Sequence, residues 1–259
     1  MSSHPRTVAA GSAVPPHPAV ATTGSRQWLW RRWFGLVTLG ELLGFGVPAV
    51  VGALVADRAG AVAAVALLSA GAVEGAVLGW FQARALRPVL PALRGRNWIA
   101  ATVVGALVAW SVGALLVLTD GLRGWAPTLT ATTMVLGGVV ILLSIGTAQW
   151  FVLRDLVDRA ARWIAATAAA WLAGLAAFTA FTTPLWQPGQ PVALIALIGG
   201  GGGLVMAAAM AAVSGAFLVR LTARSDGSAA TRSPVSGSTT STACARNSAE
   251  RSPTSRWSR

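Results

Sequence analysis

Six apolar runs, each about as long as a membrane is thick, constrain this chain more than any other feature of its sequence. They occupy residues 33–55, 61–82, 98–118, 129–152, 163–183 and 192–219. A helix needs roughly 20 apolar residues to cross the hydrocarbon core of a bilayer. The helices of a soluble all-α protein carry a polar stripe toward water, whereas these runs are apolar on every side. The sequence therefore predicts an all-α fold, a polytopic transmembrane bundle of six helices.

One pattern recurs through these runs. Residues 78–87 are written again at 145–154, with glycine, glutamine, leucine and arginine matching at a shift of 67 residues. A third, less similar copy of the glycine–arginine end of this segment occupies residues 214–220. Tryptophans spaced by 65 residues open the copies, at Trp33, Trp98 and Trp163. Because self-similarity at a fixed period indicates tandem structural units, we expect three helical hairpins in a pseudo-threefold arrangement, at about 33–87, 98–154 and 163–220.

The basic residues, all of them arginine, predict the orientation of the bundle. Of the 20 arginines, 18 lie before the first run, in the second and fourth connections, or after the last run. Only Arg58 and Arg123 lie in the other connections. The positive-inside rule then puts both termini in the cytoplasm of a cell with an inner (plasma) membrane. We expect the anionic inner leaflet to attract these arginines, and the net charge of +12 therefore does not require a nucleic-acid partner.

The two ends of the chain differ in composition from the apolar runs. Residues 1–27 are rich in proline, alanine and serine, and residues 222–259 are rich in serine, threonine and arginine. Such composition favours disorder, so the expected domains are a 1–27 tail, a 28–221 transmembrane domain and a 222–259 basic tail. The only histidines, His4 and His17, and the only cysteine, Cys244, lie in these tails, so no metal site or disulfide is expected.

Glu41 and Glu74 are the only ionisable residues well inside the apolar runs. Glu41 precedes the turn at Asp57 by 16 residues and Glu74 follows it by 17, so the two carboxyls should lie at nearly one depth. Ionisable groups in a membrane are expensive and indicate function by default. Two neighbouring carboxyls do not both ionise readily, so the pair would form a proton or cation site. The alternative is that each stays neutral and hydrogen-bonds a neighbouring helix.

Gln82 and Gln149 recur at equivalent places near the ends of their helices. An amide at such a place bridges helices or caps free carbonyls, and its repetition favours a structural role.

Tryptophan is abundant near helix ends, where it is typical of an interfacial aromatic belt. The belt predicted in this way contains Trp28, Trp30, Trp33, Trp80, Trp98, Trp125, Trp150, Trp163 and Trp186.

Two further stretches have competing interpretations. Acid-to-base pairs four residues apart, Asp155 with Arg159 and Asp158 with Arg162, favour an exposed helical extension over a functional charge cluster. Residues 199–203 are five consecutive glycines within the last run. They favour close helix packing over a hinge that lines a cavity.

The apolar runs contain no histidine, no paired metal ligands and no phosphate-binding glycine loop. We therefore expect no catalytic residues, no cofactor and no enzymatic activity. Two function classes remain. The chain is a small transporter-like or permeation module that uses Glu41 and Glu74, or it is a non-catalytic scaffold or accessory subunit that packs against a membrane-protein partner or another copy of itself.

The segments Gly79-Trp-Phe-Gln82 and Gly146-Thr-Ala-Gln149-Trp-Phe-Val-Leu-Arg154 resemble a known pattern. They look like a group of uncharacterised bacterial multi-pass membrane proteins with repeated G-x-x-Q-W-x-x-L-R segments. The resemblance covers about residues 33–220. The first copy has Ala83 where the second has Trp150, and the third copy has Leu218 in place of the glutamine. The resemblance implies a bacterial membrane protein and no particular activity.

Overall fold

The computed structural model describes residues 23–58 and 60–231. Within them the chain forms six α-helices, one short 3-10 turn and no strand. The helices are α1 (Thr23–Leu54), α2 (Gly60–Leu86), α3 (Gly95–Leu118), α4 (Pro127–Leu153), α5 (Arg162–Thr182) and α6 (Val192–Thr231), with η1 (Asp120–Leu122) between α3 and α4. Each of the six α-helices in this part of the chain is long and apolar enough to cross a membrane. The predicted all-α transmembrane bundle is confirmed, and the protein is an integral, multi-pass membrane protein.

The first and last helices run further than the sequence predicted. α1 begins at Thr23 rather than near residue 28, and α6 continues to Thr231, past the expected boundary at residue 221. Proline is the strongest helix breaker, and the flanking prolines are Pro18 and Pro234, so no proline ends either helix sooner. Residues 1–22, 59 and 232–259, which include both histidines and Cys244, lie outside the described residues.

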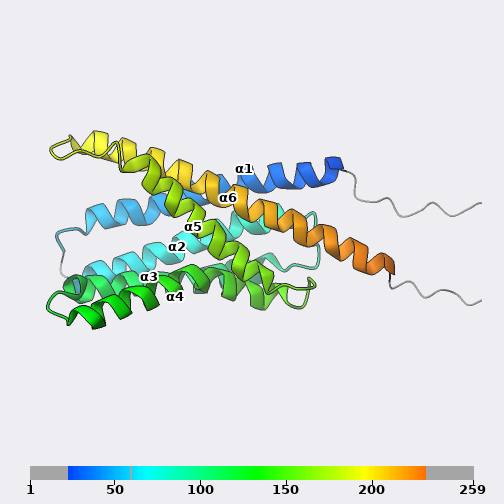
Figure 1. The fold of residues 1–259 in the computed structure, drawn as a ribbon, viewed down its shortest axis with the longest axis horizontal. Helices are drawn as coiled ribbons and strands as arrows, with labels where there is room; N and C mark the ends of the chain where they lie inside the picture. The colour runs from blue at the N-terminus through cyan, green and yellow to red at the C-terminus, as the bar shows by residue number, and fades with distance from the viewer. Residues whose placement is uncertain (1–22, 59, 232–259) are drawn as a thin grey trace, which may run out of the picture.

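The six helices form a closed ring of neighbours. Consecutive helices pack against one another, and α1 also packs against α6. The α1–α2, α3–α4 and α5–α6 connections lie at one end, which we call the hairpin end (Figure 1). The α2–α3 and α4–α5 connections lie at the other end, with the start of α1 (Figure 1). We call this the arginine-rich end, because of the described arginines only Arg58 and Arg123 belong to the hairpin end.

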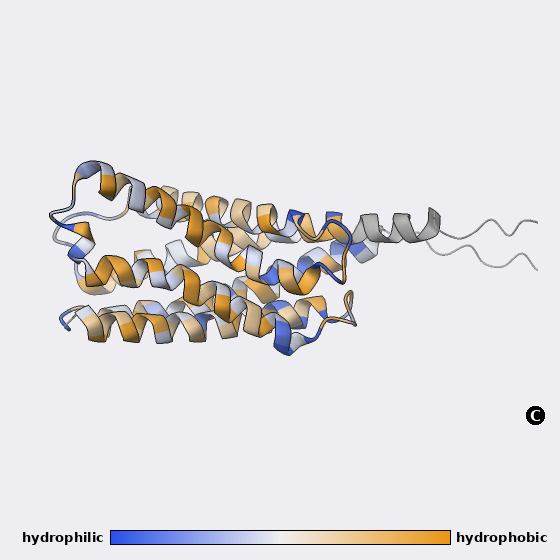
Figure 2. Cartoon of the chain, turned by 90° about the horizontal axis from the view of Figure 1, so that it is seen from below, coloured by the Kyte–Doolittle hydropathy of each residue, from blue (hydrophilic) through white to orange (hydrophobic). Residues whose placement is uncertain are grey.

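Hydrophobic residues cover the length of the helices, and hydrophilic residues gather toward the two ends of the bundle (Figure 2). Many large apolar side chains face outward; those at least 60% exposed include Leu54, Val135, Leu136, Val192 and Leu197. Exposed apolar area on this scale is incompatible with a monomer in water, whereas in a bilayer it would contact lipid tails.

Glycines let neighbouring helices approach to backbone contact. A Cβ added to Gly79 of α2 would lie 3.0 Å from the Cα of Ile99 in α3. A Cβ added to Gly146 of α4 would lie 3.1 Å from the Cα of Ile164 in α5. Gly79 and Gly146, which occupy the same place in two copies of the repeated segment, thus each face an isoleucine that directly follows the opening tryptophan of the next unit. Helices in lipid associate largely through van der Waals packing of small residues, so these contacts hold successive hairpins together.

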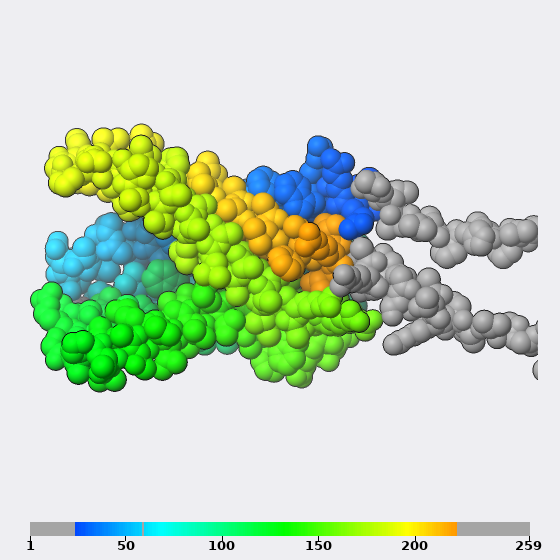
Figure 3. All heavy atoms as spheres, viewed as in Figure 1, coloured from blue at the N-terminus to red at the C-terminus, as the bar shows by residue number. Residues whose placement is uncertain are grey.

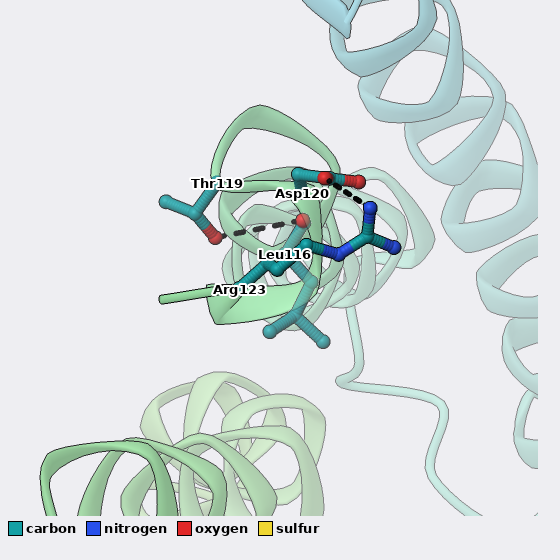
Figure 4. Close-up of polar contacts among 4 residues, drawn as sticks. All are labelled: Leu116, Thr119, Asp120 and Arg123. Atoms are coloured by element: carbon teal, nitrogen blue, oxygen red, sulfur yellow. Dashed lines mark hydrogen bonds and ion pairs between the residues drawn. The ribbon is translucent and has the colours of Figure 1, made fainter. Parts of the chain in front are cut away.

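The α3–α4 connection is a tight turn at the hairpin end. All three residues of η1 have positive φ. The Thr119 hydroxyl donates to the Leu116 carbonyl at 3.5 Å, and the Arg123 guanidinium lies 3.1 Å from the Asp120 carboxylate (Figure 4). Arg123, one of the two arginines at this end, is therefore paired with an acid of its own turn.

The segment between α4 and α5 is not the helical extension that the sequence predicted. Residues 154–161 form turns, and Arg159 has a φ of 58°. A continuous α-helix requires negative φ at every residue, so the four-residue register of the Asp–Arg pairs is lost. Arg154 and Asp155 approach instead, with 3.8 Å between Nε and Oδ1.

A methyl group at Gly105 should destabilise the bundle, because a Cβ there would lie 2.6 Å from the Cα of Ile145 in α4. We expect Gly105→Ala to lower the free energy of unfolding in detergent by about 1–3 kcal/mol, the usual cost of overpacking. Gly138→Ala is the matched control, because nothing lies within 4 Å of its added Cβ and alanine has the better helix propensity. An equal loss of stability in both variants would contradict this packing role.

Candidate functional site

Each repeated tryptophan donates its indole N–H to a polar side chain of the unit before it. The pairs are Trp98 Nε1 to Gln82 Oε1 (3.1 Å), Trp163 Nε1 to Gln149 Oε1 (2.8 Å) and Trp33 Nε1 to Ser214 Oγ (2.9 Å). We call these six residues the indole network. Its bonds join the second unit to the first, the third to the second, and the first back to the third. Polar groups without water must find protein partners, and here each bond also connects two hairpins.

Gln149 is the centre of this network and is fully buried. Its Nε2 donates to Gln82 Oε1 at 2.7 Å and to Thr102 Oγ1 at 2.9 Å. Its Oε1 accepts the indole N–H of Trp163. The two glutamines singled out by the sequence are therefore in direct contact, and they bridge helices as their repetition favoured. The choice between the amide oxygen and nitrogen follows from these donors and acceptors.

The three repeated tryptophans meet in the bundle core, which corrects part of the predicted aromatic belt. Trp33 and Trp98 are 0% exposed and Trp163 is 2% exposed. The Trp33 and Trp163 rings pack edge to face with centroids 5.7 Å apart, and Trp98 lies 6.1 Å from Trp163. Their indoles turn inward because the buried acceptors of the network lie there. Exposed tryptophans near helix ends remain compatible with a belt: Trp28, Trp80, Trp125 and Trp186.

Glu41 of α1 and Glu74 of α2 face the interior of the bundle. Each is 7% exposed, and both line one cavity of about 10 Å³. Each lies eight residues from a member of the indole network, Glu41 from Trp33 and Glu74 from Gln82, which corresponds to about 12 Å along a helix toward the hairpin end. Gly44 allows this approach, because a Cβ there would lie 3.2 Å from the Glu74 carbonyl oxygen.

The two carboxyls have different partners. Glu74 Oε2 accepts the indole N–H of Trp110 at 2.7 Å, which fixes the Glu74 side chain against α3. No side-chain hydrogen bond joins the Glu41 carboxyl to another described residue, and its oxygens are not among the fully buried unpaired atoms of the described chain. Glu41 lines two cavities, so its carboxyl is the member of the pair that is open to them.

A second cavity connects Glu41 with the indole network. It has a volume of about 20 Å³ and is lined by Val37, Glu41, Leu78, Gln82, Ile145, Gln149, Trp163, Thr167, Ala170, Trp171, Met210 and Ser214. Glu41, Trp171 and Met210 line both cavities. The polar side chains of the interior therefore follow one line, from Glu74 through Glu41 to the amides and Ser214.

This polar line ends at the buried tryptophans. Beyond them, at the arginine-rich end, is a cavity of about 10 Å³ lined only by apolar side chains: Leu86, Leu90, Trp98, Leu153, Val157, Ala160, Trp163, Leu218 and Leu221. The structure is therefore closed by indole rings and leucines on this side of the glutamates.

No protein-family model matches this chain, and neither a curated protein nor a solved structure matches it. The resemblance to the proteins with G-x-x-Q-W-x-x-L-R segments stays a prediction. Among the described residues no group of three or more His, Cys, Asp or Glu is placed to hold a metal ion.

Sequence reasoning missed two tryptophans of the site. Trp110 and Trp171 lie in the middle of α3 and α5 rather than at their ends. That position is itself a signal, because a buried indole N–H needs an acceptor and a belt residue belongs at the interface. A second signal is spacing: Trp171 follows Glu41 by 130 residues, twice the 65-residue spacing of the repeated tryptophans, and it lines the cavity that Glu41 lines.

The five glycines of α6 lie in continuous helix. A Cβ at Gly202 would lie 2.5 Å from Thr182 Cγ2, and one at Gly201 would lie 3.1 Å from the Phe181 ring, so these two glycines pack against α5. Gly203 has open space at its Cβ position and lines the glutamate cavity. The stretch combines close packing with a cavity wall, without local unwinding.

Trp163→Phe should weaken the bundle, because it leaves the buried Gln149 Oε1 without its donor. The expected loss is about 1–3 kcal/mol in the free energy of unfolding, measured by denaturant titration in detergent. Trp125→Phe is the matched control: Trp125 is 38% exposed, and the expected change is within about 0.5 kcal/mol. A double-mutant cycle with Gln149→Leu should give a coupling energy, and additive losses would argue against the bond.

Proposed function

We propose that this protein is a small transporter-like or permeation module of a bacterial plasma membrane, in which Glu41 and Glu74 form an intramembrane proton or cation site. The observation that carries the proposal is that both carboxyls, on two different helices, line one cavity inside the bundle. Buried ionisable groups in membrane proteins mark ion pathways and proton relays. The proposal assigns no enzymatic reaction to the chain.

The form of the interior supports a pathway that is closed at one end. The space-filling view shows a hollow in the side of the bundle, between α4 and the paired α5 and α6, in the half of the molecule near the hairpin end (Figure 3). On the other side of the glutamates, the buried tryptophans and leucines leave no polar route to the arginine-rich end. We infer that transport requires this second barrier to open, as in proteins that expose a central site to each side in turn.

The arginine distribution supports the orientation. We infer that the arginine-rich end faces the cytoplasm, with both termini on that side and the anionic inner leaflet as its lipid partner. Three guanidinium groups at this end stack on exposed rings three or four residues earlier in the chain: Arg32 on Trp28, Arg84 on Trp80 and Arg154 on Phe151. We expect arginines held in this way to lie where phosphate headgroups meet the apolar core.

A scaffold or accessory subunit is the second candidate function. A shallow apolar groove of about 400 Å³ between α3 and α4 favours it. It is lined by Val104, Gly105 and Val108 of α3 and by Val139, Val140, Leu143, Ser144, Thr147, Ala148 and Phe151 of α4. A helix of a membrane partner or of a second copy fits a groove in which small residues such as Gly105 and Ala148 allow close approach. Co-purification after crosslinking in membranes tests this function, and recovery of the chain alone as a monomer would count against it.

We also infer that the chain belongs with the bacterial proteins that carry G-x-x-Q-W-x-x-L-R segments. The contacts of Gly79 and Gln82 give that pattern a physical meaning: the glycine admits the next unit, and the glutamine accepts its opening tryptophan.

Purified protein in liposomes should carry protons or monovalent cations across the bilayer, and Glu41→Gln with Glu74→Gln should abolish the flux because both carboxyls of the site are lost. Flux is measured with an entrapped pH dye and with a radioactive cation tracer. Asp57→Asn is the matched control, since it removes an exposed carboxyl at the α1–α2 turn. Flux that survives the double substitution would exclude the proposed site.

Single cysteines should report the orientation in intact cells. In a Cys244→Ser background, Asp57→Cys at the hairpin end should react with a membrane-impermeant maleimide added outside. Asp158→Cys in the α4–α5 connection should react only after permeabilisation. Both positions are exposed, so access is decided by the membrane alone. The reverse labelling pattern would invert the proposed topology.

A further inference from the structure

We infer that the Glu41–Glu74 site takes protons and does not take metal cations. This rests on the proposed function and deepens it, since that function leaves the proton and the cation open. Three features carry the inference. The two cavities are small, the neighbouring amide and hydroxyl oxygens already accept hydrogen bonds, and the Glu41 carboxyl has no hydrogen-bond partner among the described residues.

The cavities are too small for a hydrated cation. Their volumes are about 10 Å³ at the glutamates and about 20 Å³ between Glu41 and the amides. A cavity needs roughly 10–15 Å³ of this kind to hold one water molecule. A metal ion would therefore enter with almost no water and would have to be coordinated by the protein itself.

The amide oxygens and the Ser214 hydroxyl oxygen around these cavities already accept hydrogen bonds. Gln82 Oε1 accepts hydrogen bonds from Trp98 and from Gln149. Gln149 Oε1 accepts one from Trp163, and Ser214 Oγ accepts one from Trp33. An N–H that points at an oxygen keeps its positive end where a cation would sit, so these oxygens are poor ligands for a metal.

The oxygens that remain are the Thr167 hydroxyl, which lines the second cavity and donates to the Trp163 carbonyl, and the carboxyl oxygens of the two glutamates, one of which accepts the Trp110 indole N–H. Divalent ions in proteins take about six to eight oxygens for calcium and six for magnesium. Among the described lining residues of the glutamate cavity, every other side chain is apolar or an indole: Phe45, Trp171, Met206, Ala207 and Met210, with Gly203. A dehydrated metal ion would be under-coordinated at this site, whereas a proton needs only one acceptor.

The site meets the requirement of a proton for a single acceptor. When Glu41 holds the proton, its O–H bond breaks as a water oxygen or a Glu74 oxygen takes the proton, which leaves a carboxylate on Glu41. A water in the second cavity would then meet Gln82 and Thr167, which line that cavity. No covalent bond other than O–H changes, and no oxidant or metal is required.

No other charged group competes for this role in the described chain. Up to residue 221, the helices packed around the glutamates carry further charges only near the arginine-rich end: Arg26, Arg31 and Arg32 on α1, Arg84 on α2, Arg96 on α3, Arg162 on α5 and Arg220 on α6. None of them lines either cavity. The titratable groups at the site are therefore Glu41 and Glu74 alone.

The test uses the full-length chain in liposomes with a potassium diffusion potential, negative inside. An entrapped pH dye reports proton entry, and radioactive sodium and rubidium report cation entry. We expect proton entry above that of protein-free liposomes, with no sodium or rubidium entry above the same background. Glu41→Gln should reduce proton entry to background, while Glu41→Asp should retain part of it, because it keeps a titratable carboxyl.

The outcomes separate this inference from the proposed function. Sodium or rubidium entry that Glu41→Gln abolishes would overturn proton selectivity and leave the transport function standing. No entry of any ion would overturn both. Proton entry that survives Glu41→Gln would overturn the role of Glu41.

A fold check and a control variant guard against loss of the fold. Glutamine keeps the hydrogen-bonding capacity of the neutral acid, so Glu41→Gln should elute from size exclusion like the parent. Asp57→Asn removes an exposed carboxyl at the α1–α2 turn, outside both cavities, so it should retain proton entry. In infrared difference spectra, the parent should show a protonated-carboxyl band that is absent from Glu41→Gln. Its persistence in that variant would overturn the assignment to Glu41.

Discussion

The hydrogen bond from a buried indole to a polar side chain of the neighbouring unit is the interaction on which the bundle depends. Lipid tails offer no hydrophobic reason for one hairpin to prefer another, and apolar packing alone fixes register weakly. An indole N–H inside the bundle, by contrast, has no water to accept it and must meet an oxygen. Trp98 and Trp163 meet the amides of Gln82 and Gln149, so each unit is fixed in depth against its predecessor.

Glycine makes that interaction geometrically possible. Gly79 and Gly146 stand three residues before the two glutamines, on the face that receives the next unit. Without a Cβ at these positions, the following helix comes close enough for its tryptophan to reach the amide. The third interface departs from the pattern, since Ser214 accepts from Trp33 directly beside Gly215, whose added Cβ would lie 2.8 Å from the Trp33 ring. A hydroxyl next to the glycine thus replaces an amide one turn further on.

The sequence predicted the fold class well, because apolar length alone decides whether a helix spans a bilayer. It also singled out Gln82 and Gln149, which do meet, since repetition at one spacing implies equivalent places. It was wrong about Trp33, Trp98 and Trp163, which it assigned to the lipid interface, because position along a helix does not reveal rotation about its axis. For the same reason the depth of Glu41 and Glu74 could be estimated in advance, whereas the Trp110 bond, which depends on how α3 is turned, could not.

The same network that holds the units together also closes the polar interior. Glu41 and the two glutamines line one cavity, and the next cavity toward the arginine-rich end is wholly apolar. Any opening in that direction must move Trp98 or Trp163, and such a movement breaks a bond between two hairpins. Access from the arginine-rich end is therefore coupled to the contacts that set the relative depth of the units. A change of state in this bundle would displace whole hairpins against one another rather than turn a single side chain, which is how membrane proteins built from repeats expose a central site.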